Sequence, residues 1–387
     1  MPHDTQLHDA LKRLRGKGGD LVFTVIGAGH GGLAMAGHLG IQGFPVRLYN
    51  RTEENLHAVR WHGGIQVTGA VEGFGPVQRA TTSMEEAIDG ADVLMVVVPA
   101  TAHATIAGLM ARALQPGQMV VLNPGRTGGA LAFCHALKEQ GVSPAVIVGE
   151  TSTFLYASRA ISRAEARIFR IKNTVRFATL PAYFIPEALP VLQRAFPPFA
   201  SGDSVLSTGM ENIGAIFHPA LTLLNAGWIE GTGGAFDYYR DGITPSVARA
   251  LERLDAERVA VAAALGVHAV SAREWLYLTY GSPGRDIHEA IQNTSAYLGI
   301  RAPQSIAHRY VTEDVPMSLV PLADLGRMLG VAMPMTHMII DLANTLHQAD
   351  YWAIGRTAAR MGIEGLSVKQ IRQLVVGLDP PAGKDAS

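Results

Sequence analysis

The sequence predicts a two-domain protein in which a doubly wound parallel α/β sheet is followed by an all-helical domain. Two observations support this prediction. Apolar runs of strand length alternate with helical segments over residues 21–204, and no alternating strand pattern follows over residues 205–378. The chain has 387 residues, enough for two sizeable cores. We expect residues 1–20 to form a polar leader, partly helical, rather than a signal peptide, and residues 379–387 to form a disordered tail.

A glycine-rich turn follows the first expected strand, residues 21–26. It reads Gly27-Ala28-Gly29-His30-Gly31-Gly32, and small residues suited to a helix start come next. Gly27, Gly29 and Gly32 fill the three glycine positions of the dinucleotide-binding fingerprint. The first permits the tight turn, the second lets the backbone approach a pyrophosphate, and the third lets helix pack on strand. The helix N-terminus favours phosphate. We therefore predict a Rossmann domain with residues 27–32 in its cofactor site; the alternative is an ordinary glycine-rich turn.

The end of the second expected strand, residues 44–49, indicates which dinucleotide binds. NAD sites usually place a carboxylate about 20 residues after the glycines, to bind the ribose 2′-hydroxyl. Here Asn50, Arg51 and Thr52 occupy that position. No carboxylate repels a 2′-phosphate, and a guanidinium is present to bind one. We predict that these three residues contact the cofactor and that NADP(H) is favoured, with NAD(H) as the alternative. A solvated loop arginine is the competing interpretation of Arg51.

Three further apolar runs, residues 91–98, 118–122 and 145–149, read as central parallel strands, and residues 175–180 as a late strand of the same domain. Ligands of open α/β sheets bind beyond the carboxyl ends of the strands. We therefore expect Val98 and Pro99, at the end of the first run, to contact the cofactor.

Composition excludes several classes of protein. The formal net charge of −1 gives no basic footprint for nucleic acid. Cys134 is the only cysteine, which excludes an intrachain disulfide and a cysteine-based metal cluster, and no metal site is expected. No apolar run reaches the ~18 residues of a membrane span. We expect a cytoplasmic enzyme with no membrane partner.

The second half of the chain contains four long helix candidates. They cover residues 211–229, residues 246–265 with Ser246 as N-cap, residues 271–280 with Ser271 as N-cap, and residues 333–347.

The first of these candidates carries a polar stripe on an otherwise apolar helix. Glu211, His218, Thr222 and Asn225 are separated by seven, four and three residues, which places them on one helix face. Such a stripe needs polar partners or a wet cavity. Histidine is suited to proton transfer near neutral pH, but it needs an orienting group. A buried, hydrogen-bonded structural histidine is an equal alternative.

A second polar cluster occupies residues 308–316. Arg309 could hold a carboxylate through two parallel hydrogen bonds, and Glu313 or Asp314 could accept a proton from an imidazole. A charged loop followed by a helix cap is the alternative, and the sequence does not say whether this cluster meets His218.

Together these motifs resemble the octopine/nopaline dehydrogenase family, the opine dehydrogenases. The resemblance covers about residues 21–345. Its matching pieces are the glycine turn, Asn123-Pro124-Gly125-Arg126-Thr127-Gly128-Gly129, Glu150-Thr151, Asn212 with Phe217-His218-Pro219, and Arg309-Tyr310 with Thr312-Glu313-Asp314-Val315-Pro316.

The resemblance implies a Rossmann domain followed by a helical domain similar to the C-terminal domain of 6-phosphogluconate dehydrogenase. It implies that a 2-oxo acid, often pyruvate, condenses with the amino group of an amino acid to an imine, which NAD(P)H reduces. His218 would be the catalytic acid, oriented by Asp314. Arg309 would bind a substrate carboxylate, Asn212 would also contact substrate, and Thr153, or else Thr151, would lie near the nicotinamide. The resemblance also favours a homodimer.

Two departures from the family pattern bear on the substrates. Arg126 stands where some members have a neutral amide, so we expect it to bind a second carboxylate or a phosphate. No acidic residue is obvious as a binder of the substrate ammonium, although Glu211 or Asp237 could serve. Neither the amino acid nor the oxo acid follows from the sequence.

Two other functions compete with this one. A ketopantoate-reductase-like or 3-hydroxyacid-type reductase has the same plan, but those enzymes place a lysine on the first long helix, and none occurs from Met210 to Glu230. A non-catalytic NADP(H)-sensing protein is the third hypothesis.

Overall fold

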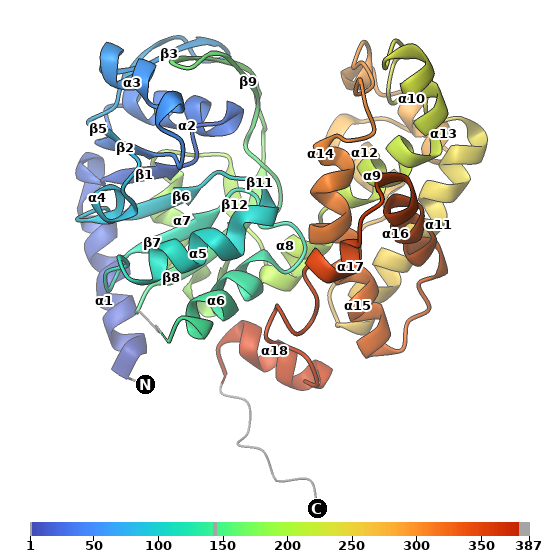
Figure 1. Cartoon of the computed structure of the whole chain (residues 1–387). Coiled ribbons are helices and arrows are strands. Elements are labelled where there is room, and N and C mark those ends of the chain that lie inside the picture. The colour runs from blue at the N-terminus through green and yellow to red at the C-terminus, as the bar shows by residue number, and fades with distance from the viewer. Residues whose placement is uncertain (1, 142–144, 379–387) are drawn as a thin grey trace, which may run out of the picture. The chain divides into compact units, whose positions relative to one another are not determined.

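The computed structural model describes residues 2–141 and 145–378, and the expected tail at 379–387 lies outside them (Figure 1). The chain forms two compact units. The first comprises residues up to Thr208 together with those from Gln373 onward, and the second comprises Gly209–Arg372. No helix in the described part of the chain is both long and apolar enough to cross a membrane.

An eight-stranded sheet forms the centre of the first unit. Its strands are β1 (Phe23–Ile26), β2 (Val46–Tyr49), β5 (Arg79–Thr81), β6 (Val93–Val96), β7 (Met119–Leu122), β8 (Ile147–Thr151), β11 (Val175–Leu180) and β12 (Phe199–Ser201). Their order is β12-β11-β8-β7-β6-β1-β2-β5. The pairs from β8 to β5 are parallel, whereas β11 runs antiparallel to β8. β1, β6 and β7 are buried throughout, as their apolar runs predict, and the predicted fold class is confirmed.

Helices pack around this sheet (Figure 1). They are α1 (Pro2–Gly16), α2 (His30–Ile41), α3 (His57–His62), α4 (Met84–Ile88), α5 (His103–Ala111), α6 (Gly129–Glu139) and α7 (Ile185–Gln193), and α8 (Val205–Met210) contains the boundary between the two units. The first helix lies in the segment that we expected to be polar and partly helical, and it carries a buried apolar stripe. Leu7, Leu11 and Leu14 are buried where α1 packs on α7. Their spacing of four and three residues is that of one helix face, so the segment is part of the first unit.

A second, smaller sheet in the first unit was not predicted. It consists of β3 (Gly64–Gly69), β4 (Gly73–Pro76), β9 (Tyr156–Ser162) and β10 (Glu165–Ile171), in the order β4-β3-β10-β9. It packs against α2, where the Tyr156 hydroxyl lies 2.8 Å from His38 Nδ1. Lys172, described below, directly follows β10.

The second unit is helical, as predicted. Its helices are α9 (Gly214–Leu224), α10 (Ala226–Thr232), α11 (Pro245–Ala264), α12 (Ala272–Tyr280), α13 (Ile287–Gln292), α14 (Arg309–Thr312), α15 (Val320–Leu329), α16 (Pro334–His347), α17 (Tyr351–Ile354) and α18 (Val368–Val376), the last of which crosses into the first unit. A π-helical turn, Val315–Leu319, precedes α15.

Two predictions about these helices are wrong in detail. Residues 211–229 are not one helix, because α9 ends at Leu224 and the chain turns at Asn225 before α10 begins. The N-cap of α11 is Thr244, whose side chain accepts a hydrogen bond from the Val247 amide, rather than Ser246. Ser271 caps α12 as predicted, accepting from the Glu274 amide.

Candidate functional site

The glycine turn between β1 and α2 has the backbone that its sequence predicts. Gly27 adopts a φ of +113°, in the region that favours glycine, and a Cβ there would overlap the Val97 carbonyl oxygen. A Cβ at Gly32 would overlap the carbonyl oxygen of Gly27, so helix and turn meet backbone to backbone. Gly29, the N-cap of α2, differs from both. A Cβ there would meet no atom of the described residues within 4 Å. Packing within the protein therefore explains two of the three glycines but not Gly29.

The side chain of Asn50 supports this turn. Its Oδ1 accepts from the Ala28 amide at 3.1 Å, and its Nδ2 donates to the Thr52 carbonyl at 3.0 Å. Arg51 and Thr52 are exposed beside it. The nearby carboxylate Glu53 pairs with Arg60. After β2 the chain thus has Asn50, whose amide is bonded within the turn, and Arg51, whose guanidinium is exposed, and neither position carries a carboxylate.

The remaining predicted cofactor residues surround the turn. His30 Nδ1 accepts from the Ala160 amide at 3.0 Å, which joins the start of α2 to β9. A Cβ at Gly31 would lie 2.7 Å from the Phe154 ring, and one at Gly27 would lie 2.9 Å from Val98 Cγ1. Pro99 is exposed at the end of the same segment.

Glu150, on β8, is a structural carboxylate of this unit. It is fully buried, and its Oε2 accepts from the Ala130 amide at 2.7 Å, in the first turn of α6. Its Oε1 accepts from the Thr208 hydroxyl at 2.7 Å. A negative charge near a helix N-terminus is stabilising. The glycine at 125 is required beside it, because a Cβ there would overlap the Glu150 carboxylate.

Arg126 and Thr153 lie at the carboxyl ends of β7 and β8 with a lysine that the sequence analysis missed. Lys172, immediately after β10, donates from Nζ to Thr153 Oγ1 at 2.6 Å. Burial, and then the positive charge of Arg126, lower the pKa of the Lys172 ammonium to about 8. No sequence signal identified Lys172, because it follows a strand of the unpredicted sheet.

In the second unit, the structure brings together His218 of α9 and Asp314, which follows α14. His218 Nδ1 lies 2.9 Å from Asp314 Oδ2, and the side chains are 21% and 1% exposed. This contact fixes the tautomer, because Nδ1 donates its proton to the carboxylate and leaves Nε2 for chemistry. Of the two acids that the sequence left open as imidazole partners, Asp314 takes this place.

Asp314 is held by further hydrogen bonds. Its Oδ1 accepts from Ser318 Oγ at 3.4 Å, and that hydroxyl accepts from Asn212 Nδ2 at 2.8 Å. Asn212 and Ser318 are buried. Asn212, which the sequence analysis expected to contact substrate, therefore bonds the serine that holds Asp314.

Two further members of the predicted polar stripe, Thr222 and Asn225, bond backbone carbonyls. Thr222 Oγ1 donates to the His218 carbonyl at 2.7 Å, and the Tyr238 hydroxyl donates to the same oxygen at 3.0 Å. Asn225 donates to the carbonyls of Leu221 and Gly242. Glu211 lies outside α9, in the turn that precedes it.

Aromatic rings continue outward from one face of His218. Tyr310 stacks on it with centroids 4.1 Å apart and planes 18° apart, and Tyr238 stacks on Tyr310 at 5.4 Å. His308 meets Tyr310 edge-on at 4.4 Å, and its Nδ1 accepts from the Tyr310 amide. Burial, and then the charges of Arg309 and His218, lower the pKa of His308.

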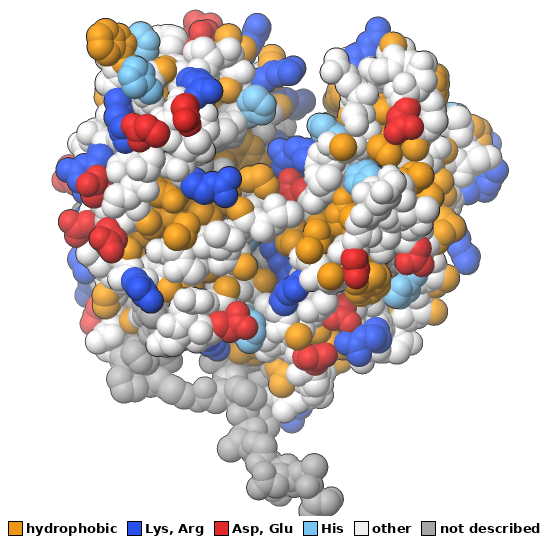
Figure 2. Space-filling model, viewed as in Figure 1, with side chains coloured by type: hydrophobic (Ala, Val, Ile, Leu, Met, Phe, Trp, Pro, Cys, Tyr) orange, Lys and Arg blue, Asp and Glu red, His pale blue; other side chains and the backbone are white. Residues whose placement is uncertain are grey.

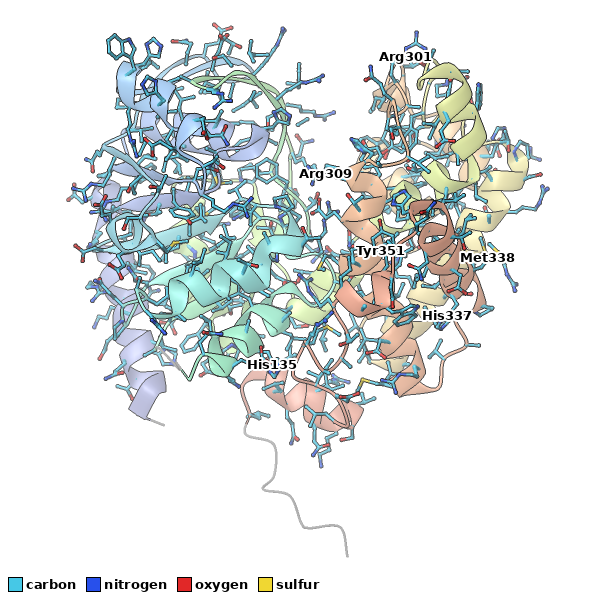
Figure 3. All side chains as sticks on the ribbon, in the orientation of Figure 1. His135, Arg301, Arg309, His337, Met338 and Tyr351 are labelled. Carbon is cyan, nitrogen blue, oxygen red and sulfur yellow. The ribbon has the colours of Figure 1, made fainter. Side chains whose placement is uncertain are left out.

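Arg309 begins α14 at the surface of the second unit (Figure 3). Its side chain is 59% exposed and pairs through Nη2, at 2.9 Å, with the buried carboxylate of Glu313. Glu313 thus positions Arg309 while Asp314 serves His218. Asp237, a candidate for binding the substrate ammonium, has other partners: its carboxylate accepts from the Gly299 amide and lies 3.7 Å from Arg301.

Comparison with known proteins identifies the relatives of both units. Residues 201–347 match the model of the NAD/NADP octopine/nopaline dehydrogenase alpha-helical domain. Residues 22–125 match the NAD binding domain of 6-phosphogluconate dehydrogenase. An opine dehydrogenase of Arthrobacter sp. (strain 1C) is 38% identical over 354 residues, which cover 91% of this chain and 98% of the relative.

Solved structures show the same fold over nearly the whole chain. Octopine dehydrogenase in complex with NADH and agmatine aligns with a TM-score of 0.77 at 22% identity, covering 94% of this chain and 100% of the other. Its complex with NADH and pyruvate gives 0.76 at 22% identity with the same coverage. Yersinopine dehydrogenase with NADP+ gives 0.70 at 17% identity, covering 93% and 98%.

Proposed function

The chain belongs to the octopine/nopaline dehydrogenase family, the opine dehydrogenases, and from that premise we propose that His218 and Asp314 form the acid–base pair of its reaction. Members are NAD(P)-dependent oxidoreductases that act on CH–NH bonds, and the reaction is the reductive condensation of a 2-oxo acid with the amino group of an amino acid. The observation that carries the proposal is the 2.9 Å contact between His218 Nδ1 and the buried Asp314 carboxylate.

The condensation step needs a group that moves protons. A C–N bond forms between the amino nitrogen and the carbonyl carbon, and the carbonyl oxygen leaves as water. The substrate ammonium loses two protons, and both are transferred to the oxygen that leaves as water. One imidazole that takes a proton from nitrogen and gives it to oxygen through Nε2 can serve both ends of this transfer. Asp314 keeps the imidazole in the required tautomer and balances its positive charge while the proton is held.

Residues 27–32 fit a dinucleotide. A Cβ at Gly29 would be tolerated by the surrounding protein, so a close approach of pyrophosphate accounts for glycine there. When a nicotinamide dinucleotide is held by these residues, it would supply the hydride that reduces the C=N bond to a secondary amine. We infer that NADP(H) is preferred, because the exposed Arg51 can pair with a 2′-phosphate and Glu53 is neutralised by Arg60.

The substrate carboxylates need cations. Arg309 is the proposed ligand for the oxo acid carboxylate, since Glu313 holds its guanidinium in place while most of the side chain stays exposed. Arg126 and Thr153 are the proposed ligands for a second carboxylate. Asn212 is proposed to act on substrate indirectly, through Ser318 and Asp314.

We propose a homodimer from exposed apolar residues on the second unit. Met338 and Leu346 of α16 and Ile354 of α17 are exposed, and Figure 2 shows apolar side chains over this part of the second unit. Light scattering behind size exclusion should then give twice the mass of the chain, and the mass of a single chain would contradict it.

The experiment that tests the function is NADPH oxidation with pooled 2-oxo acids, with and without pooled amino acids. Oxidation that needs both pools is expected, and dividing the pools then names the substrates. Oxidation with oxo acids alone would indicate a hydroxyacid- or ketopantoate-type reductase. NADPH binding without oxidation by any pool would indicate a sensor.

A further inference from the structure

Lys172 occupies a defined place at the ligand-binding edge of the main sheet. Its amide donates to the Leu155 carbonyl at 3.0 Å, which fixes the end of β10 beside the segment that follows β8. The same segment carries Thr153, and the Gly125 amide donates to the Thr151 carbonyl, which fixes the loop that carries Arg126. Three separate segments thus bring an ammonium, a guanidinium and a hydroxyl to the carboxyl ends of β7 and β8, the edge where open α/β sheets bind ligands.

The charge of the Lys172 ammonium is not balanced by a carboxylate of the described residues. Its Nζ donates to the neutral Thr153 hydroxyl, and it makes no ion pair with an acid of these residues. The charge of Arg126 acts on it and has the same sign. Removing an ammonium from water beside a second cation is unfavourable unless an anion reaches that ammonium.

The backbone at Arg126 is a second, independent sign of function. Arg126 has a φ of +64°, in the left-handed region that side chains other than glycine seldom adopt. The loop holds glycines at 125 and 128, so the chain uses glycine elsewhere in the same turn. An arginine rather than a glycine at this strained position indicates a use for its side chain.

We propose that Lys172 and Arg126 jointly bind a carboxylate of one of the two condensing substrates, with the Thr153 hydroxyl as a third donor. The inference rests on the proposed function, because that reaction brings two carboxylates to the enzyme. Arg309 is the proposed ligand of one, and the second needs a cationic site of its own. A cofactor phosphate has the same chemistry, but the turn at residues 27–32 and Arg51 already provide for the phosphates.

Lys172 makes this site sensitive to pH. The carboxylate binds the ammonium form, so its affinity is constant while Lys172 is protonated and falls when the free enzyme loses that proton. With a pKa of about 8 for Lys172, the KM of this substrate should rise above pH ~8, by about tenfold per pH unit at most. Titration of the substrate amine affects every variant equally, so comparison between variants isolates the lysine.

The test is steady-state kinetics of the active enzyme from pH 6.5 to roughly 9.5, with each substrate varied in turn. Lys172→Gln should raise the KM of one substrate roughly 10- to 150-fold at pH ~7, the range expected for losing a charged hydrogen bond. The KM of the other substrate and the Kd of NADPH should change by less than about twofold. Lys172→Arg keeps its charge over the whole pH range. The variant should therefore bind the substrate at pH ~7, and its KM should not rise above pH ~8. Lys12→Gln, an exposed lysine of α1, is the matched control.

Three outcomes would overturn the proposal. The first is an unchanged KM for both substrates in Lys172→Gln. The second is a weakened NADPH affinity in Lys172→Gln in place of a raised KM, which would assign the site to a cofactor phosphate. The third is the same pH profile in Lys172→Arg as in wild type. If the variants do not fold, a wild-type KM that stays flat above pH ~8 for both substrates decides against it. Failure of the proposed function is recognised separately, because wild type would then not oxidise NADPH with any pair of substrates.

Discussion

The phenol ring of Tyr310 lies nearly flat against the imidazole of His218, with ring centroids 4.1 Å apart and planes 18° apart. Asp314 fixes one nitrogen of that imidazole, so ring and carboxylate together set both the plane and the rotation of His218. The remaining nitrogen, Nε2, is then directed by the protein rather than by the substrate. Such preorganisation is what a proton-transfer group needs.

The role of Tyr310 can be separated from simple packing. We expect Tyr310→Leu to lower kcat roughly 2- to 12-fold, the range given by an aromatic pair energy of ~0.5–1.5 kcal/mol, while Tyr310→Phe retains most of the activity because the ring stays. The Kd of NADPH, followed by fluorescence, should not move in either variant. Equal kcat values for the Leu and Phe variants would show that the stacked ring does not position His218.

Removing the imidazole should be far more damaging. His218→Ala is expected to lower kcat by ~10²–10⁴-fold, the usual contribution of general acid–base catalysis, with NADPH binding near normal. His268→Ala, which removes an exposed histidine of the same unit, is the control and should match wild type. Near-normal turnover in His218→Ala would remove His218 from the mechanism.

The guanidinium of Arg51 should set the cofactor preference. Arg51→Ala is expected to reduce the ratio of kcat/KM for NADPH to that for NADH roughly 10- to 150-fold, since a charge-assisted hydrogen bond contributes ~1.5–3 kcal/mol. Arg51→Lys keeps the charge but not the paired donors, so its ratio should fall between the two. An unchanged ratio in Arg51→Ala would rule out the contact with a 2′-phosphate.

The two glycines Gly29 and Gly32 should fail in different ways. Gly32→Ala places a methyl group on the Gly27 carbonyl oxygen, so the free energy of unfolding should fall by ~1–3 kcal/mol or more. Gly29→Ala meets no atom of the described residues within 4 Å, so its thermal midpoint should fall less. Its Kd for NADPH should nevertheless rise about tenfold or more, because the pyrophosphate loses close approach to the backbone. Thermal melts and cofactor titrations of both variants test this, and an unaltered Kd in Gly29→Ala would count against a pyrophosphate at that position.

Much of the fold could be predicted because its signals are local. The central strands read directly as apolar runs, and the glycine turn at residues 27–32 is identified by the strand before it and the helix after it. The smaller sheet could not be predicted in the same way. Its strands β3 and β10 pair in parallel although about a hundred residues separate them, and β3 begins and ends with glycine. Neither strand has a continuous apolar run, because one face of each is exposed.

In the candidate site, too, local features could be predicted and contacts between distant segments could not. The sequence singled out His218 and the polar cluster at residues 308–316. His218 and Asp314 are 96 residues apart in the chain, and no local pattern predicts that they are in contact. The choice between Glu313 and Asp314 is equally nonlocal, because it depends on which carboxylate the fold turns toward His218 and which toward Arg309. Lys172 was missed because it depends on the end of an unpredicted strand. The break at Asn225 was missed because the apolar pattern continues through it.

The amide of Asn50 limits how this enzyme can be re-engineered for a different cofactor. The obvious design replaces the residue after β2 with aspartate to favour NAD. In this chain Asn50 uses both ends of its side chain, Oδ1 toward the Ala28 amide and Nδ2 toward the Thr52 carbonyl. An aspartate would keep the first contact but set a negative oxygen against a carbonyl in the second, which would loosen the turn that we propose binds the pyrophosphate of either cofactor. Designs that spare Asn50 and vary only its exposed neighbours avoid that loss.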